Sequence, residues 1–96
     1  MQCYVRSEAV VSRVIAGETL IVPIRKGVGD LASIYSLNEV ASAIWHAVAA
    51  PISSEKIVER LEREFAGSRA EIERDVQTFL EEMSSAGLIS PLRASA

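Results

Sequence analysis

Residues 34–45 divide this sequence into two parts with different hydrophobic periodicity. Before them, short runs rich in β-branched residues are separated by turn residues, which is typical of strands. After them, apolar residues recur every three or four positions, which is typical of amphipathic helices. Strands followed by helices predict an α+β fold of winged-helix type, with three helices packed against a three-stranded antiparallel sheet.

Three strands are expected in the first part. The runs 10–16 and 19–24 are joined by Gly17 and Glu18, and together they predict a β-hairpin. Pro23 has no N–H to give to a sheet, so we expect it at the end of its strand or facing a sheet edge. The third strand is expected at 31–35. A sheet this small has two edges, where backbone groups can remain unpaired.

Three helices are expected in the second part, at 38–49, from 53 or 54 up to Gly67, and at 68–86. Two N-caps compete at the first helix. Ser36 and Glu39 have the spacing of a capping box, whereas Asn38 is itself a preferred cap residue. Trp45, the only tryptophan, is expected to anchor the core.

The ends of the second and third helices carry clearer signals. Gly67 is placed to end the second helix in a left-handed cap, and Ser68 with Glu71 predicts a capping box for the third. Gly87 followed by the apolar Leu88 predicts a Schellman ending.

The ends of the chain show little periodicity. We expect residues 1–9 to be a loose N-terminal lead-in, residues 10–90 to form one domain, and residues 91–96 to be a disordered tail.

The composition suggests a cytoplasmic protein. The single Cys3 excludes an internal disulfide and is compatible with a reducing compartment. No secretory signal is visible, and the longest weakly charged stretch, residues 40–52, is too short to span a bilayer. We therefore expect no membrane partner.

No constellation of residues points to catalysis. His46 is the only histidine and Cys3 is the only cysteine, and the two are far apart in the sequence. The loop at 25–30 has two cations and two glycines but lacks the spacing of a phosphate-binding loop, so a turn is the better interpretation. Neither a metal nor another cofactor is implied, and we do not expect an enzyme.

Two binding functions remain. The winged-helix outline suggests a small regulator that acts on DNA or on a transcription protein. However, residues 68–87 hold two arginines and five acidic residues, a net charge of −3, which phosphates would repel. The alternative is a protein-binding module, because a strand edge beside an amphipathic helix can accept an extended peptide.

Several segments, taken in order, resemble the PqqD family, and so the RiPP recognition element. This element is the module that binds the leader of ribosomally made, modified peptides. The segments cover about four fifths of the chain, and they are residues 17–23, 35–39, 43–45, 57–61, 75–80 and 87–89.

The resemblance implies a non-catalytic chaperone that binds the leader of a precursor peptide and presents it to a modifying enzyme. In the family the leader adds to the third strand and lies against the third helix. Carried onto this sequence, the peptide-binding residues are Leu31, Ala32, Ser33, Ile34 and Tyr35 in the strand and Asp75, Val76, Phe79 and Leu80 in the helix. The helical spacing also puts the last three of these on a core-facing stripe.

The pathway is left open by the sequence. The Arg-Gly and Pro-Glu pairs of members that serve pyrroloquinoline quinone synthesis are absent, and residues 36–45 look more like stand-alone proteins of other pathways, such as lasso peptides. The implied partner enzyme is a radical SAM protein or a lasso-type protease. An unpaired edge also leaves a homodimer open.

Overall fold

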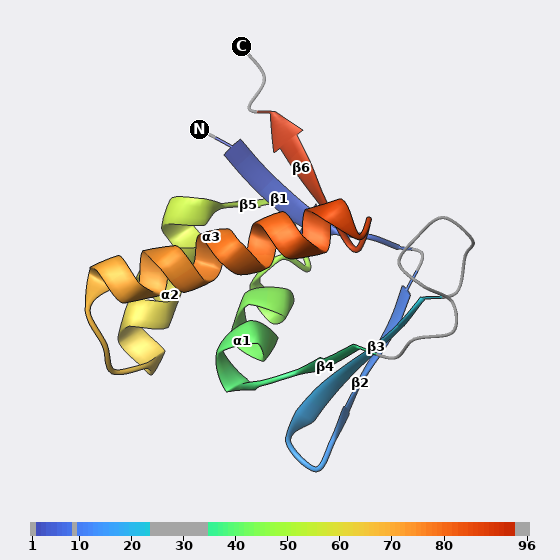
Figure 1. The fold of residues 1–96 in the computed structure, drawn as a ribbon. Helices are drawn as coiled ribbons and strands as arrows, with labels where there is room; N and C mark the ends of the chain where they lie inside the picture. The colour runs from blue at the N-terminus through green and yellow to red at the C-terminus, as the bar shows by residue number, and fades with distance from the viewer. Residues whose placement is uncertain (1, 9, 24–34, 94–96) are drawn as a thin grey trace.

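The computed structural model describes residues 2–8, 10–23 and 35–93 (Figure 1). Its helices are α1 (Glu39–Ala47), α2 (Ser54–Glu64) and α3 (Arg69–Ser85). One antiparallel sheet has the order β2-β3-β4, with β2 at Val10–Ile15, β3 at Glu18–Pro23 and β4 at Tyr35–Leu37. The other has the order β5-β1-β6, with β1 at Gln2–Arg6, β5 at Ile52–Ser53 and β6 at Ile89–Arg93. The predicted α+β class, with a three-stranded antiparallel sheet and three helices, is confirmed.

The core lies between the three helices and the inner faces of both sheets. Trp45 is 0% exposed and lies among buried aliphatic side chains, so its predicted role as a core anchor is confirmed. The buried side chains come from both sheets as well as from the helices, and the largest are Trp45, Ile21, Ile44, Ile57, Leu80, Leu88 and Ile89. Burial of this shared apolar surface is the main favourable contribution to folding.

The hairpin of β2 and β3 forms around a two-residue turn. Ala16 and Gly17 both have positive φ (54° and 81°), as a type I′ turn requires, and Ile15 pairs directly with Glu18. The turn therefore lies one residue earlier than predicted, and Glu18 belongs to β3. Pro23 ends β3, as expected.

The third strand of this sheet pairs with β3 through Tyr35, Ser36 and Leu37. Of the predicted strand at 31–35, residues 31–34 lie outside the described residues. The strand extends two residues beyond the predicted end, and for this reason Ser36 cannot cap α1. Asn38 is the N-cap instead, and its Oδ1 accepts the N–H of Ala41 at 2.8 Å.

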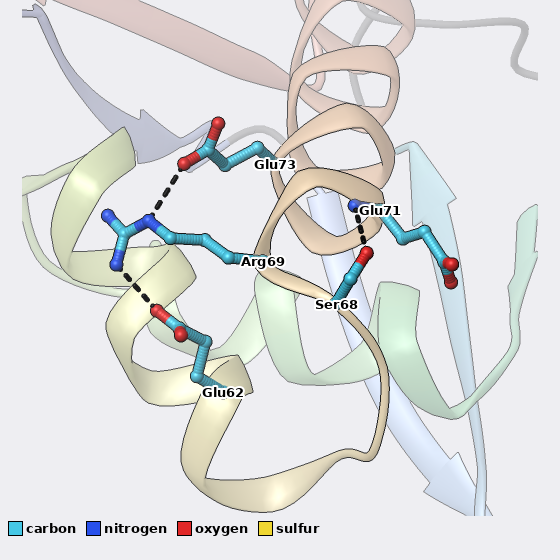
Figure 2. Close-up of polar contacts among 5 residues, drawn as sticks. All are labelled: Glu62, Ser68, Arg69, Glu71 and Glu73. Atoms are coloured by element: carbon cyan, nitrogen blue, oxygen red, sulfur yellow. Dashed lines mark hydrogen bonds and ion pairs between the residues drawn. The ribbon is translucent and has the colours of Figure 1, made fainter.

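The connection between α2 and α3 is held by polar contacts at the start of α3 (Figure 2). Ser68 Oγ accepts the N–H of Glu71 at 3.2 Å, which confirms Ser68 as the N-cap and supplies one of the two bonds of the predicted capping box. Arg69 reaches Glu62 on α2 at 2.7 Å and Glu73 on α3 at 2.8 Å. The hydrogen bond to Glu73, followed by attraction to Glu62, raises the pKa of Arg69. This exposed salt bridge fixes the orientation of α3 relative to α2 more than it stabilises the fold.

Gly67 does not end α2. The helix stops at Glu64, and its C-cap Phe65 is extended, with φ −125° and ψ 145°. The half-buried Phe65 packs against the core, so the chain leaves the helix before it reaches Gly67. Gly67 has φ 137° and serves the short connection to Ser68.

The predicted loose lead-in is wrong for Gln2–Arg6, and the predicted tail is wrong for residues 91–93. Strand β1 is the central strand of the second sheet, between β5 and β6. Tyr4 is buried, and the Arg6 N–H donates to the Val48 carbonyl at 2.9 Å. Local periodicity gave no sign of this strand because its partners are distant in the sequence.

The predicted Schellman ending of α3 is confirmed. Gly87 has φ 77°, its N–H donates to the Ser84 carbonyl, and the Leu88 N–H donates to the Met83 carbonyl. Leu88 is fully buried next to this turn, so the motif directs the chain from α3 into β6.

Replacing Gly87 tests this turn. Gly87→Ala should lower the free energy of unfolding by about 1–2 kcal/mol, because a β-carbon is unfavourable in the left-handed conformation. Gly87→Asn is the matched control and should cost less, since asparagine tolerates positive φ. Urea unfolding measures both variants, and equal losses for the two would contradict the assignment.

Candidate functional site

A groove of about 310 Å³ lies between α1 and α3. Its lining residues come from the first half of α1 with its cap and from the middle of α3, and they are Asn38, Val40, Ala41, Ile44, Arg74, Asp75, Thr78, Phe79 and Glu82. Val40, Ala41 and Phe79 are half-buried, so they present part of their apolar surface to the groove. An apolar base with a few polar groups around it is the usual composition of a binding site.

The rim of the groove is charged. Asp75 and Glu82 are exposed on α3, and Arg74 lies beside them. Positions 75 and 82 are two helical turns apart, so the carboxylates mark the two ends of the α3 wall. A partner in the groove would therefore meet apolar surface at the base and charge at both ends.

Strand β4 adjoins this groove. It lies at one end of the sheet order β2-β3-β4 and leads through Asn38 directly into α1 (Figure 1). Asn38 lines the groove while it caps the helix. The end of a sheet and a partly apolar groove are thus adjacent.

The register determines which backbone groups of β4 point away from β3. In a two-residue hairpin the residues that flank the turn form a hydrogen-bonded pair, here Ile15 and Glu18. Hydrogen-bonded and non-hydrogen-bonded pairs then alternate along an antiparallel ladder. Thr19 therefore directs its backbone groups toward β4, where it pairs with Leu37. It follows that the N–H and C=O of Ser36 point away from β3.

The predicted site residues fall into three groups. Leu31, Ala32, Ser33 and Ile34 lie outside the described residues, and Tyr35 is half-buried in β4. Asp75 and Phe79 line the groove. Val76 and Leu80 are not among the residues that line the groove, and at 1% and 0% exposed they lie in the core.

The α1 wall was missed by sequence reasoning. The helix expected at 38–49 was assigned a structural role alone, and Ser36 was interpreted only as a possible cap. The apolar periodicity of α1 is a real signal, but it does not reveal where α3 crosses the helix and leaves part of the stripe uncovered.

The described residues contain no group of three or more His, Cys, Asp or Glu side chains placed to hold a metal ion. In the same part of the chain, no helix has both the length and the apolar character needed to cross a bilayer.

Residues 18–89 match the family model of PqqD, coenzyme PQQ synthesis protein D. The chain belongs to the PqqD family. The match spans β3 to the start of β6 and includes both walls of the groove. Comparison with curated proteins found no match.

Two solved structures resemble this PqqD-family chain over nearly its whole length. TbiB1 in complex with the TbiA(beta) leader peptide is 27% identical, with a TM-score of 0.77, and the alignment covers 95% of this chain and 99% of TbiB1. Lasso peptide synthetase B1 complexed with the leader peptide is 16% identical, with a TM-score of 0.73 and coverage of 90% and 95%. The second likeness concerns the fold alone.

Amide hydrogen exchange tests the register of β4. In the protein without a partner, the Ser36 amide should exchange at least about tenfold faster than the Leu37 amide, because only Leu37 donates to β3. Residue-resolved exchange measured by NMR checks this. If Ser36 were the better protected of the two, the outward direction of its N–H would be wrong.

Proposed function

We propose that this chain binds the leader segment of a ribosomally synthesised precursor peptide and presents the precursor to a modifying enzyme, without carrying out chemistry itself. The observation that carries the proposal is the junction of a sheet end with a groove that has an apolar base. The sheet end offers backbone hydrogen bonds, and the groove offers pockets for side chains. These are the two components of peptide binding by strand addition.

The leader is proposed to add to the sheet beside β4. Ser36 supplies an N–H and a C=O that point away from β3, so one residue can exchange two hydrogen bonds with an incoming strand. Such main-chain bonds give affinity with little dependence on the peptide sequence. Leu31, Ala32, Ser33, Ile34 and Tyr35 remain proposed contacts on this same segment.

Selectivity is proposed to come from the groove. Phe79 and Val40 stand on opposite walls, and an apolar leader side chain placed between them would be removed from water. Asp75 would contact a polar or basic group of the leader at the rim. Val76 and Leu80 would contribute indirectly, by holding α3 against the core.

The likeness to TbiB1, solved with its leader peptide, supports leader binding in particular. The family model is described by coenzyme PQQ synthesis, whereas one of the two similar structures is described as a lasso peptide synthetase B1. The modifying enzyme is proposed to be a radical SAM protein or a lasso-type protease. DNA is disfavoured as a partner, since the α3 wall of the groove presents two carboxylates, Asp75 and Glu82, against one cation, Arg74.

Truncating Phe79 tests the groove. Phe79→Ala should weaken binding of a synthetic leader from a neighbouring precursor gene by about tenfold or more, because a buried aromatic contact is lost. Phe65→Ala is a matched control, since Phe65 is also half-buried but lies outside the groove. Calorimetric titration measures both, with a scrambled peptide as the negative control. If no leader encoded by a neighbouring precursor gene binds the unmodified protein, the proposal fails.

Blocking the sheet edge tests strand addition. Ser36→Pro should weaken leader binding by about three- to tenfold, because it removes the outward N–H while leaving the bonds between β4 and β3 in place. Ser36→Ala keeps the backbone donor and removes only the hydroxyl, which contacts Glu18. Fluorescence anisotropy with a labelled leader compares the two variants. Equal affinities for them would show that the leader does not pair with β4 at this residue.

A further inference from the structure

The far edge of the same sheet has the features of a second pairing surface, and we propose that it pairs with a second copy of this chain. The two β2 strands would run antiparallel, with Ser12 of one copy opposite Ser12 of the other. The pairing uses neither β4 nor the groove, so it stands independently of the proposed leader binding.

The register that directs Ser36 outward also describes the edge of β2. Because Ile15 and Glu18 form a hydrogen-bonded pair, Arg13 and Val11 also bond to β3, and the residues between them do not. The N–H and C=O groups of Val10, Ser12 and Val14 therefore point away from the sheet. Among the described strands, β2 pairs with β3 alone.

Three of the six side chains along this edge are both apolar and exposed. Val14 is 59% exposed and Ile15 is 56% exposed, and Val11 is exposed as well. Val14 lies on the same face as its direct partner Thr19, yet Thr19 is buried and Val14 is exposed. The hairpin of β2 and β3 projects beyond the helices (Figure 1). A six-residue edge strand of this composition is well suited to pair with another strand.

The two edges of the other sheet, β5-β1-β6, are protected. The Ser7 N–H donates to the Leu88 carbonyl, so alternation along β1 and β6 turns the nitrogen of Pro91 outward. Proline has no N–H, and its presence therefore blunts the edge of β6. Strand β5 has only two residues. By contrast β2 contains neither proline nor glycine, and its one charge is Arg13.

The sequence of β2 is self-complementary, which favours a second copy over an unrelated strand. With Ser12 on the two-fold axis, Val10 faces Val14 of the second copy in both directions, and β-branched residues make favourable cross-strand pairs. Arg13 then faces Val11. With the two-fold axis at Arg13, the guanidinium groups of the two copies would instead face each other. With the axis at Val11, Val14 would face no residue of the β2 strand in the second copy.

Pairing of this kind joins two three-stranded sheets into one, in the order β4-β3-β2 followed by β2-β3-β4 of the second copy. The two β4 strands then lie at opposite ends. Each copy therefore keeps its groove, and a dimer of this form could hold two leaders at once.

Sedimentation equilibrium across a concentration series, combined with residue-resolved amide exchange, tests the proposal on the full chain. We expect a monomer–dimer equilibrium that strengthens with added salt, because screening reduces repulsion between copies that each carry a net charge of −3. The amides of Val10, Ser12 and Val14 should become protected as the concentration rises. The amides of Val11 and Arg13 should be protected at every concentration.

Two variants make the test specific. Ser12→Pro should raise the dimer Kd by at least about tenfold, because each dimer loses two hydrogen bonds. Ser12→Ala keeps the N–H and should leave Kd within about twofold of the unmodified value. Val14→Lys, which puts a charge on the edge without altering the backbone, is the second disrupting variant should Ser12→Pro fail to fold.

A protein that stays monomeric to millimolar concentration would overturn the proposal. So would a dimer that Ser12→Pro and Val14→Lys both leave intact. Concentration-dependent protection at Ser36 would assign the contact to β4 instead, and protection of Ser12 only on addition of leader would make β2 a peptide edge.

Discussion

The packing around Trp45 holds the two sheets in one structure. Helix α1 follows directly from β4, and its C-cap Val48 accepts a hydrogen bond from Arg6 on β1. The Arg6 guanidinium also lies over the Trp45 ring, 5.4 Å from the centroid. A nine-residue helix thus touches a strand of each sheet, with its largest side chain fully buried between them. Displacing Trp45 would separate the hairpin from the rest of the core.

The groove is a consequence of that arrangement. Val40 and Ala41 lie one turn before Ile44 and Trp45 on the same face of α1. Ile44 and Trp45 are buried, whereas Val40 and Ala41 are only half-buried and line the groove. On α3, Val76 and Leu80 are buried while Asp75 and Phe79 are displaced around the helix toward the groove. The same helical stripes therefore serve the core on one side and the proposed leader site on the other.

Local sequence signals predicted local structure well here. The cap Ser68 and the turn at Gly87 could be identified because each depends on residues within a few positions of it. Asn38 was one of two candidate caps, and the choice between them depended on how far β4 runs. Strand β1 could not be found, since only pairing with strands far along the chain makes it a strand. The groove was half predicted: Asp75 and Phe79 came from the family resemblance, whereas the α1 wall depends on how two helices cross, which no short pattern encodes. Val76 shows the limit of such a transfer, because a family motif does not distinguish a contact from the core residue beneath it.

The central position of β1 has a consequence for the order of folding. Cys3 pairs with Ser53 on one side and with Leu92 on the other, so both ladders of this sheet close over long stretches of chain. Contacts of high sequence separation form slowly, because the chain entropy of closing the loop must be lost first. During synthesis β1 precedes the other described strands, yet its partner β6 becomes available only after α3 has been made. A strand that is translated well before its partner is therefore among the last of these strands to be completely paired.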